Sequence, residues 1–313
     1  MSALIESTQT ESSDSEQGRN VLAWLLLSAI WGASFLFIRV AVTEVGPFPL
    51  MAARVLIASV AIHAVVRARG LHAPIRPYAR RLLLLGLVHA AAPYALIAAA
   101  EVKLEASTAC VLISVQPLWT AGLAVALGKE RAHWTLPFGL LLGIAGVAVL
   151  VGWRPDATAP ASAWSVVAML LAAGLYAGGS LYAKYRMADV PVLPLTLGQQ
   201  LAAACWLAIP AAATFPTALP TPRALVAVVA LALVCTALAY ALFFRLIERI
   251  GAVRTSTVTY AIPAFGVGFG ALFLGETPST GLVGGLALIL GGLFLTNGLR
   301  LATTRRARRR CET

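Results

Sequence analysis

Long apolar stretches, separated by short polar connections, follow one another along almost the whole chain. A transmembrane α-helix needs about 20 mostly apolar residues, and ten stretches meet this requirement. Because backbone groups without hydrogen bonds are costly in hydrocarbon, each stretch is expected to form a helix. The alternation of apolar and polar residues that a transmembrane β-barrel needs is absent. The predicted spans are residues 21–42, 48–67, 80–100, 104–127, 133–151, 162–184, 192–213, 223–246, 252–274 and 280–300.

The composition supports a membrane protein and argues against a soluble one. Hydrophobic residues make up 59% of the chain and charged residues 12%, which leaves too little polar surface to cover a soluble globule. The net charge of +11 does not indicate nucleic-acid binding, because the basic residues lie in short connections between apolar stretches. Residues 1–20 are rich in Ser and Glu, and they are predicted to form a disordered cytoplasmic tail.

The distribution of Lys and Arg predicts the orientation, because cytoplasmic connections are enriched in these residues. With a cytoplasmic N-terminus, 19 of the 24 Lys and Arg residues fall on the cytoplasmic side and three fall outside. The remaining two, Arg39 and Arg54, fall within spans. We therefore expect a multi-pass protein of the plasma membrane with both termini in the cytoplasm, the second as a basic tail of residues 301–313.

An internal repeat appears when the sequence is shifted by 146 residues. Matches of Ala and Leu are expected by chance in this composition, but matches of Pro, Glu, Tyr and Gly at a single offset are not. The halves are residues 21–152 and 162–300, each with five predicted spans, so the second half inserts in the opposite orientation. The matched pairs include Tyr94 with Tyr240, Pro117 with Pro263, Glu130 with Glu276, and Gly139, Gly146 and Gly152 with Gly285, Gly292 and Gly298.

These patterns together predict the fold class. We expect an all-α polytopic membrane protein whose ten transmembrane helices form two inverted five-helix repeats. Inverted repeats are typical of secondary transporters, in which the substrate site lies near the middle of the membrane where the halves meet. The short connections leave no room for a soluble domain, so the site is expected at this seam.

Short motifs in the first two spans and in the repeated segment carry a family resemblance. They are Trp31-Gly32-Ala33-Ser34-Phe35, Pro49 followed by Arg54, and the pattern Tyr94/Pro117/Gly128–Glu130 with its copy Tyr240/Pro263/Gly275-Glu276. In these features the chain resembles the EamA-type transporters of the drug/metabolite transporter superfamily, over essentially all of residues 21–300. The resemblance implies ten spans, a central cavity and transport, often export, of amino acids, related metabolites or drugs.

Pro117 and Pro263, which the repeat matches, each lie inside a predicted span. A proline there removes one backbone hydrogen bond and crowds the carbonyl four residues earlier. At helical spacing, Pro117 shares a face with Cys110 and Ser114, and Pro263 shares one with Ser256 and Tyr260. We expect these two faces to line the cavity and the kinks to assist bending during transport. The alternative is a static kink whose free carbonyl is satisfied by neighbouring helices.

Aromatic and amide side chains supply further candidates for the cavity wall, since aromatic rings combine apolar area with a polar tip. Core packing or a position at the membrane interface is the alternative for each of them. The pair matched by the repeat, Tyr94 and Tyr240, favours the cavity. The candidates are Trp31, Tyr94, Gln116, Trp119, Tyr176 and Tyr240.

Two arginines lie within predicted spans, where an ionisable residue usually has a partner or a function. Arg39 is close enough to its span end for its side chain to reach the membrane surface. Arg54 lies deeper, so it either pairs with Glu44 or Glu101 or meets an anionic group on a substrate. The sequence leaves both alternatives open.

No acidic residue lies in the middle of a predicted span, so proton coupling through a buried acid is not expected. His89 is the deep residue that ordinarily titrates near physiological pH, although a lone histidine more often packs with its ring hydrogen-bonded. Facilitated transport without an ion therefore remains an alternative to coupled transport.

The remaining residue types argue against other function classes. The four histidines are dispersed and the four cysteines lack ligand spacing, so no enzyme active site, cofactor or metal site is expected. Cys110, Cys205 and Cys235 are interpreted as small buried side chains. Residues Arg305–Arg310 can bind anionic lipid but more simply hold the C-terminus in the cytoplasm. The preferred function is a secondary transporter that exports small amphiphilic metabolites such as amino acids by alternating access, and the alternative is a passive channel.

Overall fold

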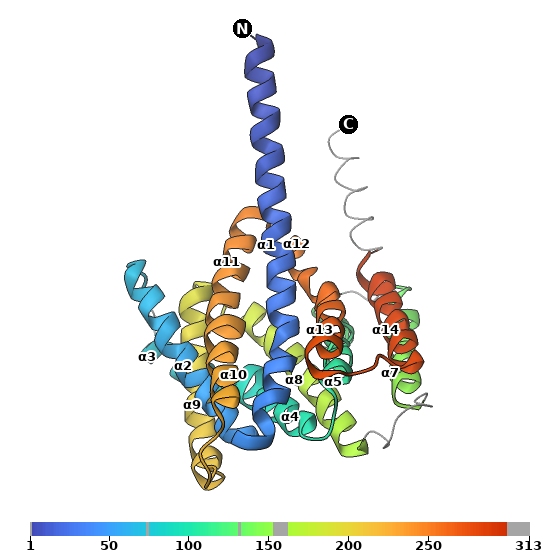
Figure 1. The fold of residues 1–313 in the computed structure, drawn as a ribbon. Helices are drawn as coiled ribbons and strands as arrows, with labels where there is room; N and C mark the ends of the chain where they lie inside the picture. The colour runs from blue at the N-terminus through green and yellow to red at the C-terminus, as the bar shows by residue number, and fades with distance from the viewer. Residues whose placement is uncertain (1, 73–74, 131–132, 153–161, 299–313) are drawn as a thin grey trace.

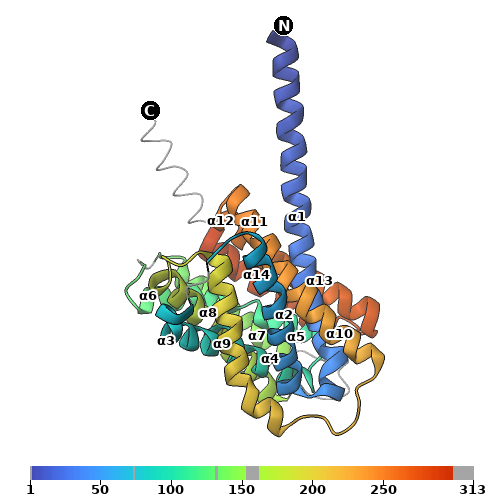
Figure 2. The same cartoon turned by 90° about the vertical axis from the view of Figure 1, so that its left-hand side faces the viewer.

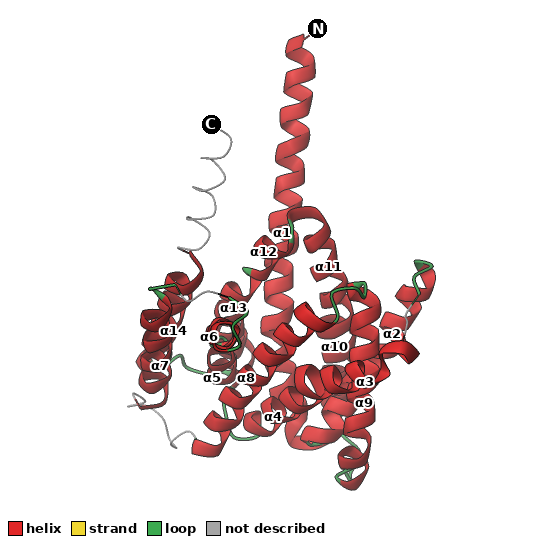
Figure 3. Ribbon diagram, turned by 180° about the vertical axis from the view of Figure 1, so that it is seen from behind, coloured by secondary structure: helices red, strands yellow, loops and turns green. Residues whose placement is uncertain are grey.

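In a computed structural model of the chain, the described residues form helices joined by short connections, and no strand occurs among them (Figures 1 and 3). The described residues are 2–72, 75–130, 133–152 and 162–298. Helices from the first half are α1 (Ser2–Val45), α2 (Pro47–Ala68), α3 (Ile75–Gly86), η1 (Leu87–Ala91), α4 (Ala92–Glu101), α5 (Ala106–Ile113), α6 (Gln116–Ala126) and α7 (Leu136–Gly152). Those of the second half are α8 (Ala163–Arg186), α9 (Val192–Ala213), α10 (Pro222–Ala232), η2 (Leu233–Leu238), α11 (Ala239–Ile250), α12 (Ala252–Ser256), α13 (Val258–Leu274), α14 (Thr280–Leu293) and η3 (Phe294–Gly298).

The number of spans agrees with the apolar pattern. Within the described residues, eight helical segments are long and apolar enough to cross a membrane, and some of them comprise two or three consecutive elements. Two shorter apolar helices, Leu136–Gly152 and Thr280–Thr296, occupy the fifth predicted span of each half. The predicted fold of ten transmembrane helices in two five-helix repeats is therefore confirmed.

The helices pack as an inverted repeat requires. The first helix of each half packs on the fourth helix of the other half, as α1 does on α13 and α8 on α6. The second helices, α2 and α9, pack on each other (Figure 2), and so do the fifth helices, α7 and α14. A two-fold axis that exchanges the halves produces this set of pairs, and it leaves the centre of the bundle lined by both halves.

Small residues bring the fifth helices into backbone contact. A Cβ atom on Gly285 would lie 2.6 Å from the carbonyl oxygen of Gly146, and one on Gly292 would lie 2.5 Å from that of Gly139. Glycine at such positions lets membrane helices approach closely. The α7–α14 pair stands at one side of the bundle (Figures 1 and 3), away from its centre.

The N-terminal segment differs from its predicted disorder. Helix α1 begins at Ser2 and extends away from the bundle as one continuous helix (Figure 1). Extending a helix is much easier than starting one, and the apolar part of α1 provides the start that the polar composition of residues 1–20 lacks. The basic tail of residues 301–313, with Arg305–Arg310, lies outside the described residues.

The cysteine interpretation is correct at two positions and wrong at one. Cys110 and Cys235 are buried, whereas Cys205 is exposed on α9. An apolar run identifies a span but not the side of the helix that faces the bundle, so a cysteine in such a run can equally face lipid.

Candidate substrate cavity

A cavity of about 360 Å³ lies at the centre of the bundle, between the two halves. This volume is at the lower end of the range for small-molecule sites, about 300–1,000 Å³. Side chains from both halves line it, and we call it the central cavity. The lining residues are Trp31, Ser34, Phe35, Ile38, Arg54, His89, Tyr94, Ile97, Ile113, Gln116, Tyr176, Ser180, Cys235, Tyr240, Phe243, Thr255, Ser256, Thr259 and Ile262.

The central cavity reaches toward one end of the bundle and stops short of the other. We call the end that contains Gly251 the inner end, and the end that contains residues 102–105 and 275–279 the outer end. Near Gly251 the cavity is lined by Ser256, which is exposed. Toward the outer end the lining stops at Ile38 and Ile97, which are 2% and 4% exposed. The cavity is thus closed by packed side chains on the outer side.

Arg54 provides a buried positive charge in the cavity wall. Its Nε donates a hydrogen bond of 2.9 Å to Thr236 Oγ1, and its guanidinium carbon lies 4.1 Å from the centre of the Tyr94 ring. The side chain is buried, and the cation–π contact and the Thr236 bond fix its orientation. These contacts use one of its five N–H groups and leave the others available to a ligand.

The predicted carboxylate partners of Arg54 are engaged elsewhere or lack a bond to it. Glu44 accepts hydrogen bonds from the backbone nitrogen and the hydroxyl of Thr221, at 2.7 and 3.0 Å. Neither oxygen of the Glu101 carboxyl has a hydrogen-bond partner among the described residues. The structural alternative for Arg54, an ion pair with either acid, is therefore wrong in this structure.

Aromatic rings from both halves form most of the remaining wall. Trp31 packs edge-on against Tyr240, with ring centres 6.4 Å apart, and lies 5.4 Å from Phe243. On the opposite side, Tyr176 lies 6.2 Å from Tyr94 in an edge arrangement. Such rings give a small ligand a large contact area with few rotatable bonds.

His89 occupies the wall as a hydrogen-bonded residue, which agrees with the packing alternative for it. Its Nδ1 lies 3.1 Å from Gln199 Oε1 and its Nε2 lies 3.1 Å from Ser180 Oγ. Its ring meets Tyr176 edge-on at 5.6 Å. Because Nδ1 faces an amide oxygen, it carries the proton, and the neutral ring can then accept the Ser180 hydroxyl at Nε2.

Two π-helical turns border the cavity at positions related by the repeat. They are η1, which contains His89, and η2, which contains Cys235 and Thr236. The first residues of the two turns, Leu87 and Leu233, are 146 positions apart. Single π-turns within α-helices are frequent at functional sites, and here they place the side chains that hold Tyr176 and Arg54.

Contacts at the outer end close the bundle. The carboxylate of Glu276 accepts hydrogen bonds from the backbone nitrogens of Ala106 and Ser107, at 2.7 and 2.9 Å, and so caps the N-terminus of α5. The guanidinium of Arg39 donates to the backbone oxygens of Glu101 and Val102 at the end of α4. Arg39 therefore binds the carbonyls at a helix C-terminus.

Eight of the eleven predicted cavity residues line the central cavity, namely Trp31, Arg54, His89, Tyr94, Gln116, Tyr176, Tyr240 and Ser256. Three others lie elsewhere. Ser114 donates its hydroxyl to the Val111 carbonyl of its own helix. Trp119 is 44% exposed on α6 and faces α8 at Gly174. Tyr260 packs against the hydrophobic core.

The two spans that contain Pro117 and Pro263 are each divided into two helices, whereas only a kink was predicted. The fourth span of the first half divides into α5 and α6, and Pro117 lies in the first turn of α6, where its missing N–H costs no hydrogen bond. Pro263 lies inside α13, after the break at Thr257. Cys110 is buried against Ile262 and Gly266 of α13. Neither it nor Ser114 nor Pro117 is among the lining residues, so this face does not line the cavity as predicted.

Several lining residues were missed because they carry no distinctive sequence signal. Ser34, Ser180, Thr255 and Thr259 are hydroxyl residues in apolar runs, where most such groups bond to their own backbone. Ser34 lies within the tryptophan motif of the first span, and its spacing of three residues from Trp31 was the available clue.

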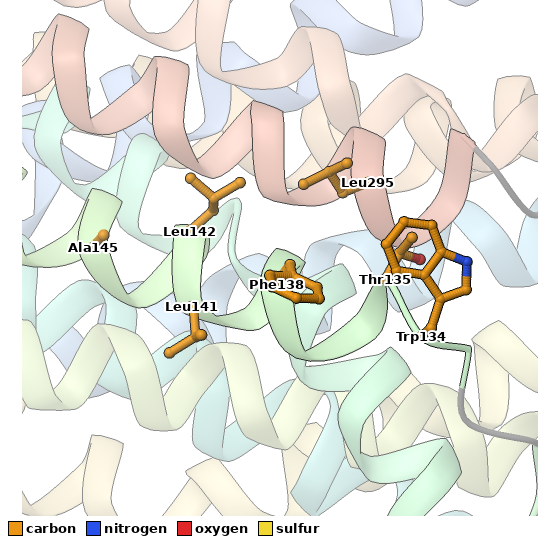
Figure 4. Close-up of a pocket in the computed structure, with 7 residues that line it drawn as sticks. All are labelled: Trp134, Thr135, Phe138, Leu141, Leu142, Ala145 and Leu295. Atoms are coloured by element: carbon orange, nitrogen blue, oxygen red, sulfur yellow. The ribbon is translucent and has the colours of Figure 1, made fainter.

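A second, shallower pocket is not a candidate for the same role. It lies on the exposed face of α7 and is lined by Trp134, Phe138, Leu141 and neighbouring apolar side chains together with Leu295 (Figure 4). Phe138 and Leu141 are 56% and 62% exposed. An exposed apolar face on a transmembrane helix is the surface that contacts lipid tails.

Within the described residues, no group of three His, Cys, Asp or Glu side chains can hold a metal ion.

Comparison with known proteins identifies the family. The model of the EamA-like transporter family matches residues 19–152 and again residues 163–298. The chain belongs to the EamA-like transporter family. The two matches coincide with the two halves of the repeat, and a family of transporters confirms the prediction of a transporter instead of an enzyme.

Curated relatives of this EamA-like protein match it over most of its length. A "probable terminal-alkyne amino-acid exporter" of Streptantibioticus cattleyicolor is 29% identical over 92% of this chain and 96% of the relative. A "probable amino-acid metabolite efflux pump" of Salmonella typhimurium is 27% identical over 90% of this chain and 96% of the relative. The "uncharacterized inner membrane transporter YedA" of Escherichia coli K12 is 26% identical over 82% of this chain and 83% of the relative.

A solved crystal structure has the same fold. It covers 90% of this chain and 97% of its own, with a TM-score of 0.65 and 24% sequence identity. The EamA-like chain is thus a multi-pass membrane transporter with a small cavity between two inverted halves.

Proposed function

We propose that this protein exports amino acids or closely related zwitterions by alternating access, with Arg54 as the residue that binds the substrate carboxylate. The observation that carries the proposal is the buried guanidinium in the cavity wall without a carboxylate partner among the described residues. Arginine is well suited to this role because its planar donors match a carboxylate.

The other cavity residues suit the rest of such a substrate. Rings of Trp31, Tyr94 and Tyr240 offer contact to an apolar or cationic group. Gln116 and Ser180 add amide and hydroxyl groups at the edge of the cavity. The names of the two amino-acid-related relatives support the same substrate class, and both describe export.

Alternating access is supported by the closed outer end and the inverted repeat. One half packs against the other through pairs of equivalent helices, so the same set of contacts can in principle be rebuilt with the opposite end closed. A passive channel needs a pathway open at both ends. The packed residues Ile38 and Ile97 favour the carrier over the channel.

Binding measurements on the purified protein test the substrate class. Thermal stability is recorded with an amino acid, with its methyl ester and with the corresponding amine, for the intact protein and for Arg54→Gln. We expect stabilisation by the amino acid alone, and loss of that stabilisation in Arg54→Gln. The lost hydrogen bonds to a charged group, about 1.5–3 kcal/mol, correspond to binding weaker by roughly ten- to a hundredfold.

The matched control is Arg249→Gln, which removes an exposed arginine at the end of α11. This variant should bind as the intact protein does. Equal stabilisation by the ester and the free acid would contradict a carboxylate site at Arg54. Stabilisation by the amine alone would replace the proposed substrate class with organic cations.

A further inference from the structure

Glu101 is a buried acid that the proposed transport mechanism does not use. It is the last residue of α4, and it is 0% exposed. Neither of its carboxyl oxygens has a hydrogen-bond partner among the described residues. Nearly all buried polar groups are hydrogen-bonded, and an ionised carboxylate without partners is especially unfavourable in an apolar environment.

The position of Glu101 relates it to the cavity and to the outer closure. Tyr94 and Ile97 line the cavity from α4, and Glu101 follows Ile97 by about one helical turn on the same face. The backbone carbonyl of Glu101 accepts the hydrogen bond from Arg39. Glu101 thus lies between the closed outer limit of the cavity and the outer end of the bundle.

Charged and titratable groups surround Glu101 on the elements that pack against α4, but each of the three charged groups bonds to another partner. Arg39 binds backbone carbonyls, Glu276 binds the backbone of α5, and Arg54 binds Thr236. Glu101 is therefore near opposite and like charges without a bond to either. The groups that face it are Arg39 on α1, Arg54 on α2, Cys110 on α5 and Glu276 in the connection before α14.

We propose that Glu101 is a binding site for one proton, and that proton binding there is linked to closure of the outer end. In the closed structure the side chain is a neutral carboxylic acid. When the outer end opens, water reaches the carboxyl, which transfers its proton to a water molecule to give a carboxylate and H₃O⁺. Closure reverses this step, and the proton returns from H₃O⁺ to the carboxylate.

This inference rests on the proposed alternating access, and it replaces the expectation that no buried acid takes part. A low pH on the outer side favours the closed form, and a high pH favours the open form. Because one proton is exchanged, the ratio of the two forms changes by at most about tenfold per pH unit.

Distance measurements between two spin labels test the proposal. The labels are placed by Lys103→Cys and Thr277→Cys, two exposed positions on opposite sides of the contact between Glu276 and α5. Exposed Cys205, and Cys311 in the basic tail, are replaced by Ser in this background. The populations of short and long distances are measured between pH 5 and pH 9, with and without a bound amino acid.

We expect the long-distance population to grow with pH in the protein with native Glu101. Glu101→Gln, a neutral side chain of the same shape, should keep the short distance at every pH, and Glu101→Asp should restore a pH response. The matched control Glu105→Gln removes an acid four residues along the same segment and should respond as the native protein does.

Three results would overturn the inference. A pH response that is unchanged in Glu101→Gln would assign the proton to another group. Populations that respond to the amino acid but not to pH would refute the proton site and leave the proposed function standing. Populations that respond to neither would refute alternating access at the outer end, and this inference with it.

Discussion

The carboxylate of Glu276 provides a quantitative test of the outer closure. It accepts two backbone hydrogen bonds from the N-terminus of α5, at 2.7 and 2.9 Å. It comes from the second half of the repeat, while α5 belongs to the first, so this contact breaks if the outer ends of the halves separate. A hydrogen bond to a charged group contributes about 1.5–3 kcal/mol, and Glu276 is partly exposed, which favours the lower value.

The substitution Glu276→Gln keeps one acceptor oxygen but removes the charge and one of the two acceptors. We expect it to destabilise the closed form by about 1.5 kcal/mol relative to the open form. This corresponds to roughly a tenfold increase in the ratio of open to closed molecules. Glu276→Ala removes both bonds and should increase the ratio by a further factor of about ten.

The assay is the population of the long distance between labels at positions 103 and 277, measured at one fixed pH. Glu248→Gln serves as the control, because it removes an exposed carboxylate at the opposite end of the bundle. An unchanged ratio in both Glu276 variants would refute the idea that this cap holds the outer end closed. A change of equal size in this ratio for Glu248→Gln would show that net charge causes the effect.

Three further predictions follow from packing and contacts. Tyr94→Phe retains the ring that lies 4.1 Å from Arg54, so substrate affinity should change less than about threefold, whereas Tyr94→Ala should lower it by roughly tenfold, as ligand titration would measure. Gly285→Val places atoms against the Gly146 backbone, at 2.6 Å for the first carbon, and should destabilise the protein by about 1–3 kcal/mol in thermal unfolding. Trp134→Ala alters only the lipid-facing pocket and should leave transport rates in proteoliposomes unchanged.

The repeat was the part of the sequence that predicted most of the architecture. Matches such as Pro117 with Pro263 lie at one offset, and an odd number of spans in each half requires inversion. The pairing of α2 with α9 and of α7 with α14 follows from that inversion. The repeat offset and the number of spans can be read along the chain, so predicting them does not require knowing how the helices pack.

The sequence predicted less accurately which residues of a span point toward the cavity and which point toward other helices or lipid. Ser114 and Pro117 share a helical face only if the helix is continuous, and the break between α5 and α6 interrupts that face. Trp119 lies on the same span and is 44% exposed, so it does not face the cavity as predicted. The orientation of a buried helix depends on its neighbours, which a single apolar run does not identify.

The burial of residues near the ends of spans also could not be predicted from the sequence. In the sequence, Glu101 directly follows the predicted span of residues 80–100, where a side chain is usually close to water. Neighbouring helices cover it completely, so distance from the span end is a poor guide to exposure within a bundle. The same covering closes the cavity beyond Ile97, and it is what makes Glu101 a candidate proton site.

The central claim, a carrier that binds an amino acid at Arg54, is tested most directly by counterflow in proteoliposomes. Vesicles are loaded with unlabelled amino acid and diluted into a trace of labelled amino acid. We expect the label to accumulate transiently above its external concentration with the native protein, and this accumulation to be lost with Arg54→Gln and kept with Arg249→Gln. Uptake that only equilibrates and does not saturate would contradict the carrier mechanism and indicate a channel.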